Sequence, residues 1–168
     1  MPEKDSYVVY GDNGVCHITD ICSETMFNKT RTYYILKPVN TPGSIIHVPA
    51  DNETLLARMR MIPDKNEILK LIDDLKEERI PWEKNNRLRS EIFSDILNRG
   101  NQKEMLVLIR TIWEKRKNLA AENKKLGASD DSALKKAEKT INEEFGFVLS
   151  VEPKDVPSFI AARLSKTD

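Results

Sequence analysis

The stretch Tyr7-Val8-Val9-Tyr10-Gly11-Asp12-Asn13-Gly14 decides the character of the first third of the chain. Its first half consists of β-branched and aromatic residues, which favour an extended strand. Its second half consists of residues that tolerate a positive φ, so the chain is expected to turn there. The stretch therefore predicts a strand followed by a tight turn, as at the start of an antiparallel sheet.

Three more strand-like segments follow at short intervals. They are residues 15–21, residues 30–37, ended by Pro38 and a turn at 40–43, and residues 44–49. Short strands at this spacing indicate a small SH3-like barrel or a strongly bent antiparallel sheet over residues 1–60. A domain of about 60 residues is marginally stable alone and leaves at least one sheet edge open. Because an open edge can recruit a strand from a partner, this domain is a candidate docking surface.

After residue 60 the period of the apolar residues becomes helical. Five segments carry apolar residues at helical spacing. They are marked by Ile68, Leu71, Ile72 and Leu75; by Leu88, Ile92, Phe93, Ile96 and Leu97, with Pro81 and Trp82 at the helix start; by Met105, Leu108, Ile109, Ile112 and Trp113; by Leu134, Ala137, Ile141, Phe145 and Val148; and by Phe159, Ile160 and Leu164. These segments predict a compact five-helix all-α domain over residues 61–168, so the expected fold class is α+β.

The composition favours an intracellular protein. Of the 168 residues, 39% are apolar and 32% are charged, and no stretch approaches the roughly 18 consecutive apolar residues that a membrane span needs. The N-terminal residues lack the basic and apolar regions of a signal peptide. Two cysteines, Cys16 and Cys22, are few for a secreted protein, and their spacing with His17 and His47 matches no metal site. We expect a cytoplasmic protein without a metal.

Charge is balanced overall but uneven along the chain. The chain has 27 basic and 27 acidic side chains, whereas residues 84–117 hold 9 basic and 4 acidic ones, a net charge of +5. A locally basic stretch fits a polyanion partner. A solvated helix face produces the same pattern, so charge alone leaves both interpretations open.

The sequence lacks the motifs of common active sites. It has no glycine-rich phosphate loop, no GxSxG elbow and no HExxH. Adjacent carboxylates such as Asp73-Asp74 and Glu143-Glu144 diverge by about 100° around a helix axis, which fits solvated faces rather than an acid–base pair. We therefore expect a protein that is not an enzyme, needs no cofactor and acts by contacting other macromolecules.

The two tryptophans differ in their surroundings. Trp113 lies inside an apolar stripe and is expected in the core. Trp82 has Asn85 and Asn86 at the next helical positions, so no local apolar stripe explains it. Lys84 and Arg87 follow it, and an aromatic side chain beside cations suits a nucleic-acid backbone with a stacked or wedged base. Packing of Trp82 against another helix is the alternative.

Over essentially its whole length the chain resembles the CarD/CdnL family of bacterial RNA-polymerase-binding regulators. The residues that carry the resemblance are Val8-Val9-Tyr10, Gly14, Tyr34-Ile35-Leu36-Lys37, Val48-Pro49-Ala50 with Asn52, Trp82 at the start of a basic helix, and Ile109-Arg110-Thr111-Ile112-Trp113. The resemblance implies an N-terminal Tudor-like domain, shared with the transcription-repair coupling factor, that binds the β subunit of RNA polymerase through a strand edge. It also implies a helical domain that reaches promoter DNA at the upstream edge of the transcription bubble and stabilises the open complex.

The resemblance also implies particular contact residues. On the polymerase side they are Glu24, Met26, Ile45, Ile46, His47 and Val48. On the DNA side they are Trp82, as a minor-groove wedge, and Lys84, Asn85 and Arg87 on or near phosphates, with little sequence preference. Glu24 and His47 stand where relatives can have arginines, so the polymerase contact is expected to be less electrostatic here. A protein–protein adaptor of the transcription machinery, with Trp82 as a buried or interface residue, is the alternative function.

Overall fold

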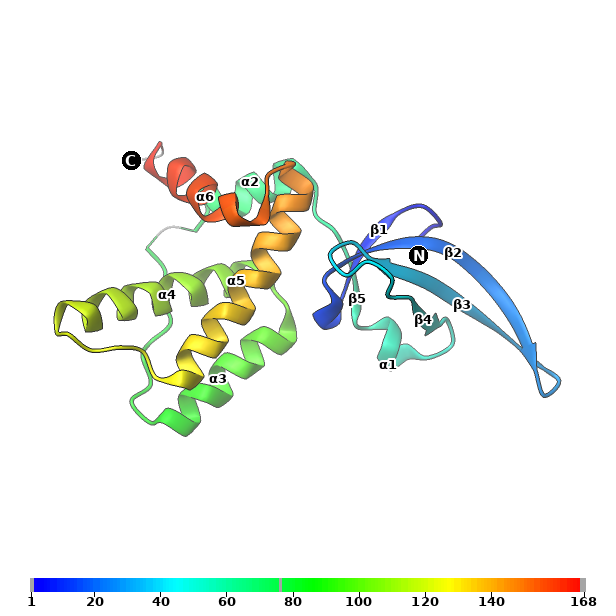
Figure 1. Cartoon of the computed structure of the whole chain (residues 1–168), viewed down its shortest axis with the longest axis horizontal. Coiled ribbons are helices and arrows are strands. Elements are labelled where there is room, and N and C mark those ends of the chain that lie inside the picture. Colours follow the sequence, from blue (N-terminus) through cyan, green and yellow to red (C-terminus); the bar gives the residue numbers. More distant parts are fainter. Residues whose placement is uncertain (1, 76, 167–168) are drawn as a thin grey trace. The chain divides into compact units, whose positions relative to one another are not determined.

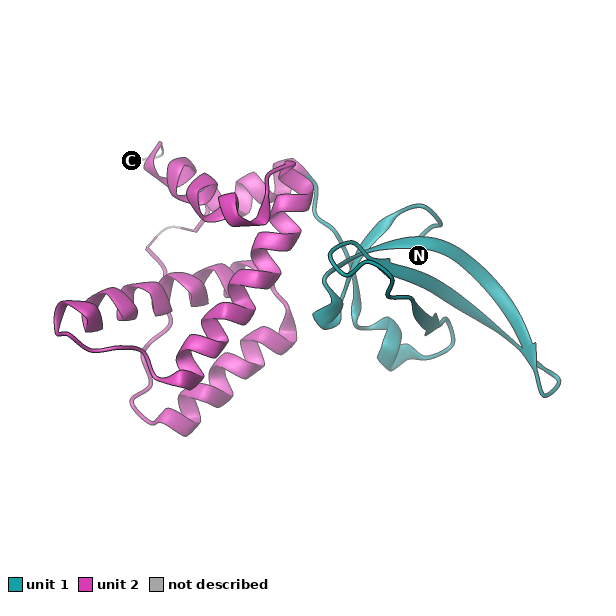
Figure 2. Cartoon of the chain, viewed as in Figure 1, with its two compact units in different colours: residues 1–64 teal, residues 65–168 magenta. Residues whose placement is uncertain are grey.

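The computed structural model describes residues 2–75 and 77–166. The chain divides into two compact units, residues 1–64 and residues 65–168 (Figure 2). The first unit extends to residue 64, beyond the boundary expected after residue 60, because a short strand at Met59–Met61 pairs with the first strand of the sheet. Each unit has its own cluster of buried hydrophobic side chains.

The first unit is a five-stranded antiparallel sheet in the order β4-β3-β2-β1-β5 (Figure 1). The strands and one 3-10 turn are β1 (Tyr7–Tyr10), η1 (Gly11–Asn13), β2 (Val15–Met26), β3 (Lys29–Pro38), β4 (Ile46–Pro49) and β5 (Met59–Met61). A short helix, α1 (Glu53–Leu56), begins where the Asn52 side chain accepts a hydrogen bond from the backbone N–H of Leu55. The expected strand-and-turn pattern at residues 7–14 is confirmed.

Three features of the sheet differ from the sequence-based expectation. Strand β2 runs to Met26 instead of Ile21, β4 begins at Ile46 instead of Ser44, and β5 was not expected. Strands β2 and β3 are long because they continue as a two-stranded hairpin past the end of β1 (Figure 1). The hairpin turns through Phe27 and Asn28, which both have positive φ. Neither residue is a glycine, so the usual sequence signal of a two-residue turn is absent.

The buried face of the sheet follows the period of two that strands impose. The buried side chains are Val8, Tyr10, Cys16, Ile18, Tyr34, Leu36 and Val48, with Ile46, Ala50, Leu55, Leu56 and Met59 packed around them. Burial raises the pKa of the Cys16 thiol from 9.0 to about 11 because a thiolate would lose its hydration there. The Cys16 side chain is therefore a small apolar member of this core.

The second unit contains the five expected helices. They are α2 (Lys65–Asp73), α3 (Asn86–Arg99), α4 (Gln102–Ala121), α5 (Ala128–Leu149) and α6 (Val156–Ser165), with the 3-10 turn η2 (Pro153–Asp155) before α6. Among the described residues, none of the helices combines the length and the hydropathy that a membrane span requires. The fold is α+β.

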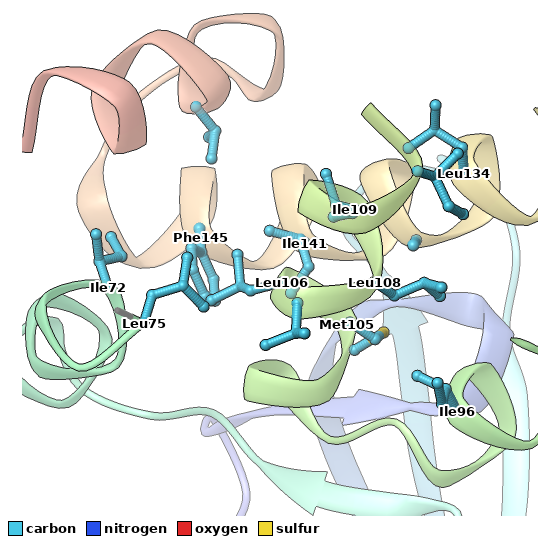
Figure 3. Close-up of a cluster of buried hydrophobic side chains, with 14 of the residues drawn as sticks. Ile72, Leu75, Ile96, Met105, Leu106, Leu108, Ile109, Leu134, Ile141 and Phe145 are labelled. Carbon is cyan, nitrogen blue, oxygen red and sulfur yellow. The ribbon is translucent and has the colours of Figure 1, made fainter. Parts of the chain in front are cut away.

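The core of this unit joins residues from all five helices. Ile72 and Leu75 meet Leu106 and Phe145 in its interior, and Leu134 and Ile141 lie along α5 (Figure 3). Helix α6 is held to α2 by a paired contact in which both Nε and Nη2 of Arg163 donate to the Asp73 carboxylate at 2.8 Å. That contact holds the pKa of Asp73 below its usual value.

The start of α3 corrects one expectation. Pro81 and Trp82 were expected in the first turn of this helix, but the helix begins at Asn86. The reason is the helix cap. Asn85 has an extended backbone, and its side-chain oxygen accepts hydrogen bonds from the backbone N–H groups of Arg87 and Leu88, as is typical of the residue before a first helical turn. Trp82 therefore lies in the irregular segment before the helix.

Candidate nucleic-acid and partner-binding sites

Trp82 is half-buried and makes contacts on several sides. Its ring packs edge-on against Phe93 of α3, with 5.9 Å between ring centroids. The guanidinium carbon of Arg89 lies 4.6 Å from the Trp82 ring centre, and the ammonium nitrogen of Lys115 on α4 lies 5.2 Å from it. Both cations are within the range of a cation–π interaction. Trp82 is thus neither sealed in the core nor freely mobile on the surface.

Arg89 acts as the internal support of this segment. Its side chain is buried, and its Nε and Nη2 donate to the two carboxylate oxygens of Asp130 at 2.8 and 2.9 Å. Its Nη1 donates to the backbone oxygen of Glu83 at 2.7 Å, and Nη2 also donates to Asn86 Oδ1 at 2.9 Å. Because its hydrogen-bonding groups face the protein, Arg89 fixes the segment beside Trp82 instead of offering a free cation to a phosphate.

An open cavity of about 710 Å³ lies beside Trp82. Its walls come from the N-cap and first turn of α5 and from six other residues: Trp82, Lys84, Asn86, Arg89, Lys115 and Leu119. Within the described part of the chain, neither Lys84 nor Lys115 forms an ion pair with a carboxylate. The site therefore combines a positioned aromatic ring with two cations that remain available to an anionic partner.

The four residues expected on DNA have different surroundings. Trp82 and Lys84 line the same cavity. The side-chain oxygen of Asn85 is occupied by the cap of α3. Arg87 is almost fully exposed, and its Nε lies 3.3 Å from Glu91 one turn further along α3. The structure thus brings Trp82 and Lys84 together and leaves Asn85 and Arg87 outside the cavity walls.

Two residues of this site carried no individual signal in the sequence. Lys115 was one of nine basic residues in the stretch 84–117, and nothing in its neighbours distinguished it. Asp130 is not one of the apolar positions that marked the helices in the sequence. Both reach Trp82 or Arg89 only through the packing of α4 and α5 against α3, so local pattern could not identify them.

The second candidate site is the outer edge of β4. No strand of the described residues pairs with this edge. The backbone N–H of Ala50 donates to Thr32, and Tyr34 lies opposite Val48. Since hydrogen-bonded pairs alternate in an antiparallel ladder, the N–H and C=O of His47 point away from β3. This backbone is available to an added strand.

The side chains expected to bind polymerase divide between two faces of the sheet. Val48 is fully buried and Ile46 packs against the core. The alternation that turns His47 outward turns the N–H and C=O groups of Ile46 and Val48 toward β3, so these two residues offer an incoming strand neither a side chain nor a free backbone group. His47 and Ile45 are exposed, and the His47 ring meets Tyr33 edge-on at 6.3 Å. His47 thus lies on the outer face of the sheet.

Glu24 and Met26 lie on the β2–β3 hairpin, on the opposite side of β3 from β4. Glu24 is paired across the hairpin with Arg31, whose Nε donates to Asp51 at 2.9 Å just beyond β4. Residues that pair across neighbouring strands have their side chains on the same face of the sheet, as do alternate residues along one strand. Glu24, Tyr33 and His47 therefore share the outer face. Of the expected polymerase-binding residues, Glu24 and His47 thus lie on the outer face of the sheet, whereas Ile46 and Val48 lie on its buried face.

Comparison with known proteins supports the resemblance inferred from the sequence. Residues 3–61 match the family described as CarD-like/TRCF RID domain. No curated protein matches the chain. The match covers the sheet of the first unit, and the expectation of a CarD-like N-terminal domain is confirmed. No group of three or more potential metal-ligating side chains occurs among the residues that the structure describes.

Proposed function

Because residues 3–61 match the family described as CarD-like/TRCF RID domain, we propose that the chain is a bacterial transcription regulator. It binds the β subunit of RNA polymerase with its first unit and stabilises the promoter open complex with its second. The protein works in the cytoplasm, associated with the nucleoid through polymerase, and acts by binding, without an enzymatic step or a cofactor.

The open edge of β4 supports the polymerase contact. A strand of the β subunit that pairs with β4 completes the ladder through the outward N–H and C=O of His47. Pro49 has no N–H to offer, so the pairing ends there. Backbone pairing of this kind needs little charge, which suits the presence of Glu24 and His47 on the adjoining face. Polymerase binding then raises the local concentration of the second unit at promoter DNA.

The observation that carries the DNA contact is the placement of Trp82 between Arg89, Phe93 and Lys115 beside an open cavity. An indole held in one orientation loses little conformational entropy when it inserts at an unstacked base step. Lys84 and Lys115 then contact the phosphates next to that step. Two such contacts provide weak affinity for DNA alone, so the interaction depends on polymerase.

The regulator acts by shifting a conformational equilibrium. Inserting an indole at the bubble's upstream edge is favourable only where the step has opened, so Trp82 binds open DNA better than closed duplex. A difference of about 1.4 kcal/mol between the two states changes their equilibrium constant tenfold. This is within the range that one well-placed aromatic side chain provides.

The proposal is tested by the lifetime of promoter open complexes after addition of a competitor. Trp82→Ala is expected to bind polymerase as the wild type does, while shortening the lifetime by about tenfold relative to the wild-type protein. Ile92→Ala is the matched control, since it removes an exposed apolar side chain of α3 that does not line the cavity. Equal lifetimes with bound wild-type protein and bound Trp82→Ala would exclude the wedge.

The alternative is a protein–protein adaptor that makes no contact with DNA. It is favoured by the half-burial of Trp82 against Phe93 and by the exposure of Leu88 and Ile92 on α3. In that case Trp82→Ala destabilises the second unit or a protein contact, and position 82 does not crosslink to promoter DNA. Crosslinking of position 82 to promoter DNA in the assembled open complex distinguishes the two functions.

A further inference from the structure

The tip of the β2–β3 hairpin carries an unusual residue. Phe27 is 95% exposed, the most exposed of the large hydrophobic side chains of the described residues, and Met26 beside it is 61% exposed. Phe27 has φ 50° and Asn28 has φ 61°. These values belong to the two central positions of a type I′ turn, where Asn, Asp and Gly are favoured. A bulky aromatic residue is rare in this backbone region.

Neither packing nor turn chemistry explains Phe27. Its ring contributes to neither buried cluster of the protein, and its backbone conformation is one that Gly or Asn adopts more readily. An exposed apolar side chain in an unfavourable backbone conformation lowers stability and solubility, and Phe27 makes no core contact that offsets this cost. Such a position is a candidate for function in a complex.

The hairpin holds this side chain in a defined place. On one face of the hairpin, the hydroxyl groups of Ser23 and Thr32 lie 3.0 Å apart, and those of Thr25 and Thr30 lie 2.9 Å apart. These cross-strand pairs stiffen a ribbon that has no neighbouring strand toward its tip. A stiff ribbon presents Phe27 with little entropy left to lose on binding.

The opposite face of the hairpin has the composition of a binding surface. An open hollow of about 740 Å³ is lined there by apolar Met26, Phe27 and Tyr33 together with charged Glu24 and Lys29. Thr30, Arg31 and Asp51 complete its wall. Exposed aromatic residues surrounded by charged ones are typical of the energetic centre of a protein–protein interface.

This surface continues into the edge of β4. Tyr33 lies opposite Pro49 in the sheet and contacts His47, and Arg31 is joined to Asp51 at the end of β4. A protein that adds a strand to β4 therefore also places part of its surface next to the β2–β3 hairpin. The hollow and the β4 edge thus form one continuous surface that a single partner can cover.

We propose that Phe27 anchors the hairpin tip in an apolar pocket of the RNA polymerase β subunit, beside the strand that pairs with β4. This inference rests on the proposed function and adds to it a contact residue and its chemistry. Phe27 adds an apolar contact to an interface in which Glu24 and His47 provide little positive charge.

The test compares three full-length variants for binding to RNA polymerase core enzyme and for thermal unfolding. Phe27→Gly and Phe27→Asn both replace the aromatic ring with residues that the turn accepts, and each is expected to weaken binding by about 30-fold, the loss typical of an aromatic hot spot. Neither is expected to lower the melting temperature. Asn28→Gly, the matched control in the same turn, retains binding within about twofold.

The outcomes separate this inference from the proposed function. Wild-type affinity in both Phe27 variants would overturn the anchor, while binding by the wild-type protein would leave the polymerase contact standing. Weak binding by Phe27→Gly with normal binding by Phe27→Asn would assign the effect to turn flexibility and also overturn the anchor. Failure of the wild-type chain to bind polymerase would instead reject the proposed function.

Discussion

The guanidinium of Arg89 covers the Trp82 ring at 4.6 Å while the same group holds the Asp130 carboxylate through two hydrogen bonds. The ion pair joins α3 to α5 and is nearly inaccessible to water, with side-chain exposures of 9% and 7%. The orientation of the exposed edge of Trp82 is thus set by a buried contact that does not itself reach a partner.

The first prediction concerns this ion pair. Asp130→Asn leaves Arg89 buried beside a neutral partner, so we expect the unfolding free energy of the second unit to fall by about 3 kcal/mol. We also expect faster iodide quenching of Trp82, measured in a Trp113→Phe background. Asp131→Asn, which removes an exposed partner of Lys135, is expected to change stability by less than about 0.5 kcal/mol. Equal effects of the two substitutions would contradict the supporting role of Arg89.

The second prediction concerns the two lysines of the cavity. Lys84→Ala and Lys115→Ala are each expected to reduce the salt dependence of open-complex stabilisation by about one counterion. The measurement is the apparent affinity for polymerase–promoter complexes over a series of KCl concentrations. Lys139 on α5 does not line the cavity, so Lys139→Ala should leave the slope of affinity against salt concentration unchanged. A slope that is the same in all four proteins would remove the lysines from the DNA contact.

The third prediction separates two roles of Asn85. Because Asn85 caps α3, Asn85→Ala should lower the unfolding free energy of the second unit by about 1 kcal/mol. Asn101 caps α4 in the same way, so Asn101→Ala should have a similar effect. Asn85→Asp keeps the cap and adds a negative charge. If Asn85 only caps the helix, Asn85→Asp retains stability and open-complex lifetime. A stable Asn85→Asp protein with a shortened lifetime would place Asn85 near phosphate.

The fourth prediction follows from the buried thiol of the first unit. Burial raises the Cys16 pKa from 9.0 to about 11, so the folded state keeps a proton that the unfolded state releases above pH 9. Stability contributed by the neutral thiol is complete below pH 9 and is lost as the pH rises through 11. Between pH 8.5 and 11, wild-type protein should lose about 2 kcal/mol more unfolding free energy than Cys16→Ala. Parallel pH profiles would contradict the burial of an ionisable thiol at this position.

The sheet and the helices differ in how much their sequences revealed. The five-helix unit was predicted because each helix repeats its apolar residues at helical spacing, and that information is local. The extension of β2 beyond Ile21 was not, because residues 23–29 are exposed and carry no apolar alternation. Strand β5 was missed because Met59–Met61 is extended only through its pairing with β1. The helix start at Asn86 was misplaced because Pro81 is typical of a first helical turn, whereas the cap that begins the helix is Asn85.

By itself, the sequence determined the α+β class, the change from strands to helices near residue 60, the CarD-like character of the first unit and the choice of Trp82 as the residue to examine. These follow from periodicity, turn chemistry and motifs, which are properties of neighbouring residues. Only the tertiary structure decided that Arg89 is committed to Asp130, that Lys115 reaches Trp82 and that Phe27 stands alone at a hairpin tip. The physical reason is that core packing brings α3, α4 and α5 together, and no local pattern records which side chains then meet.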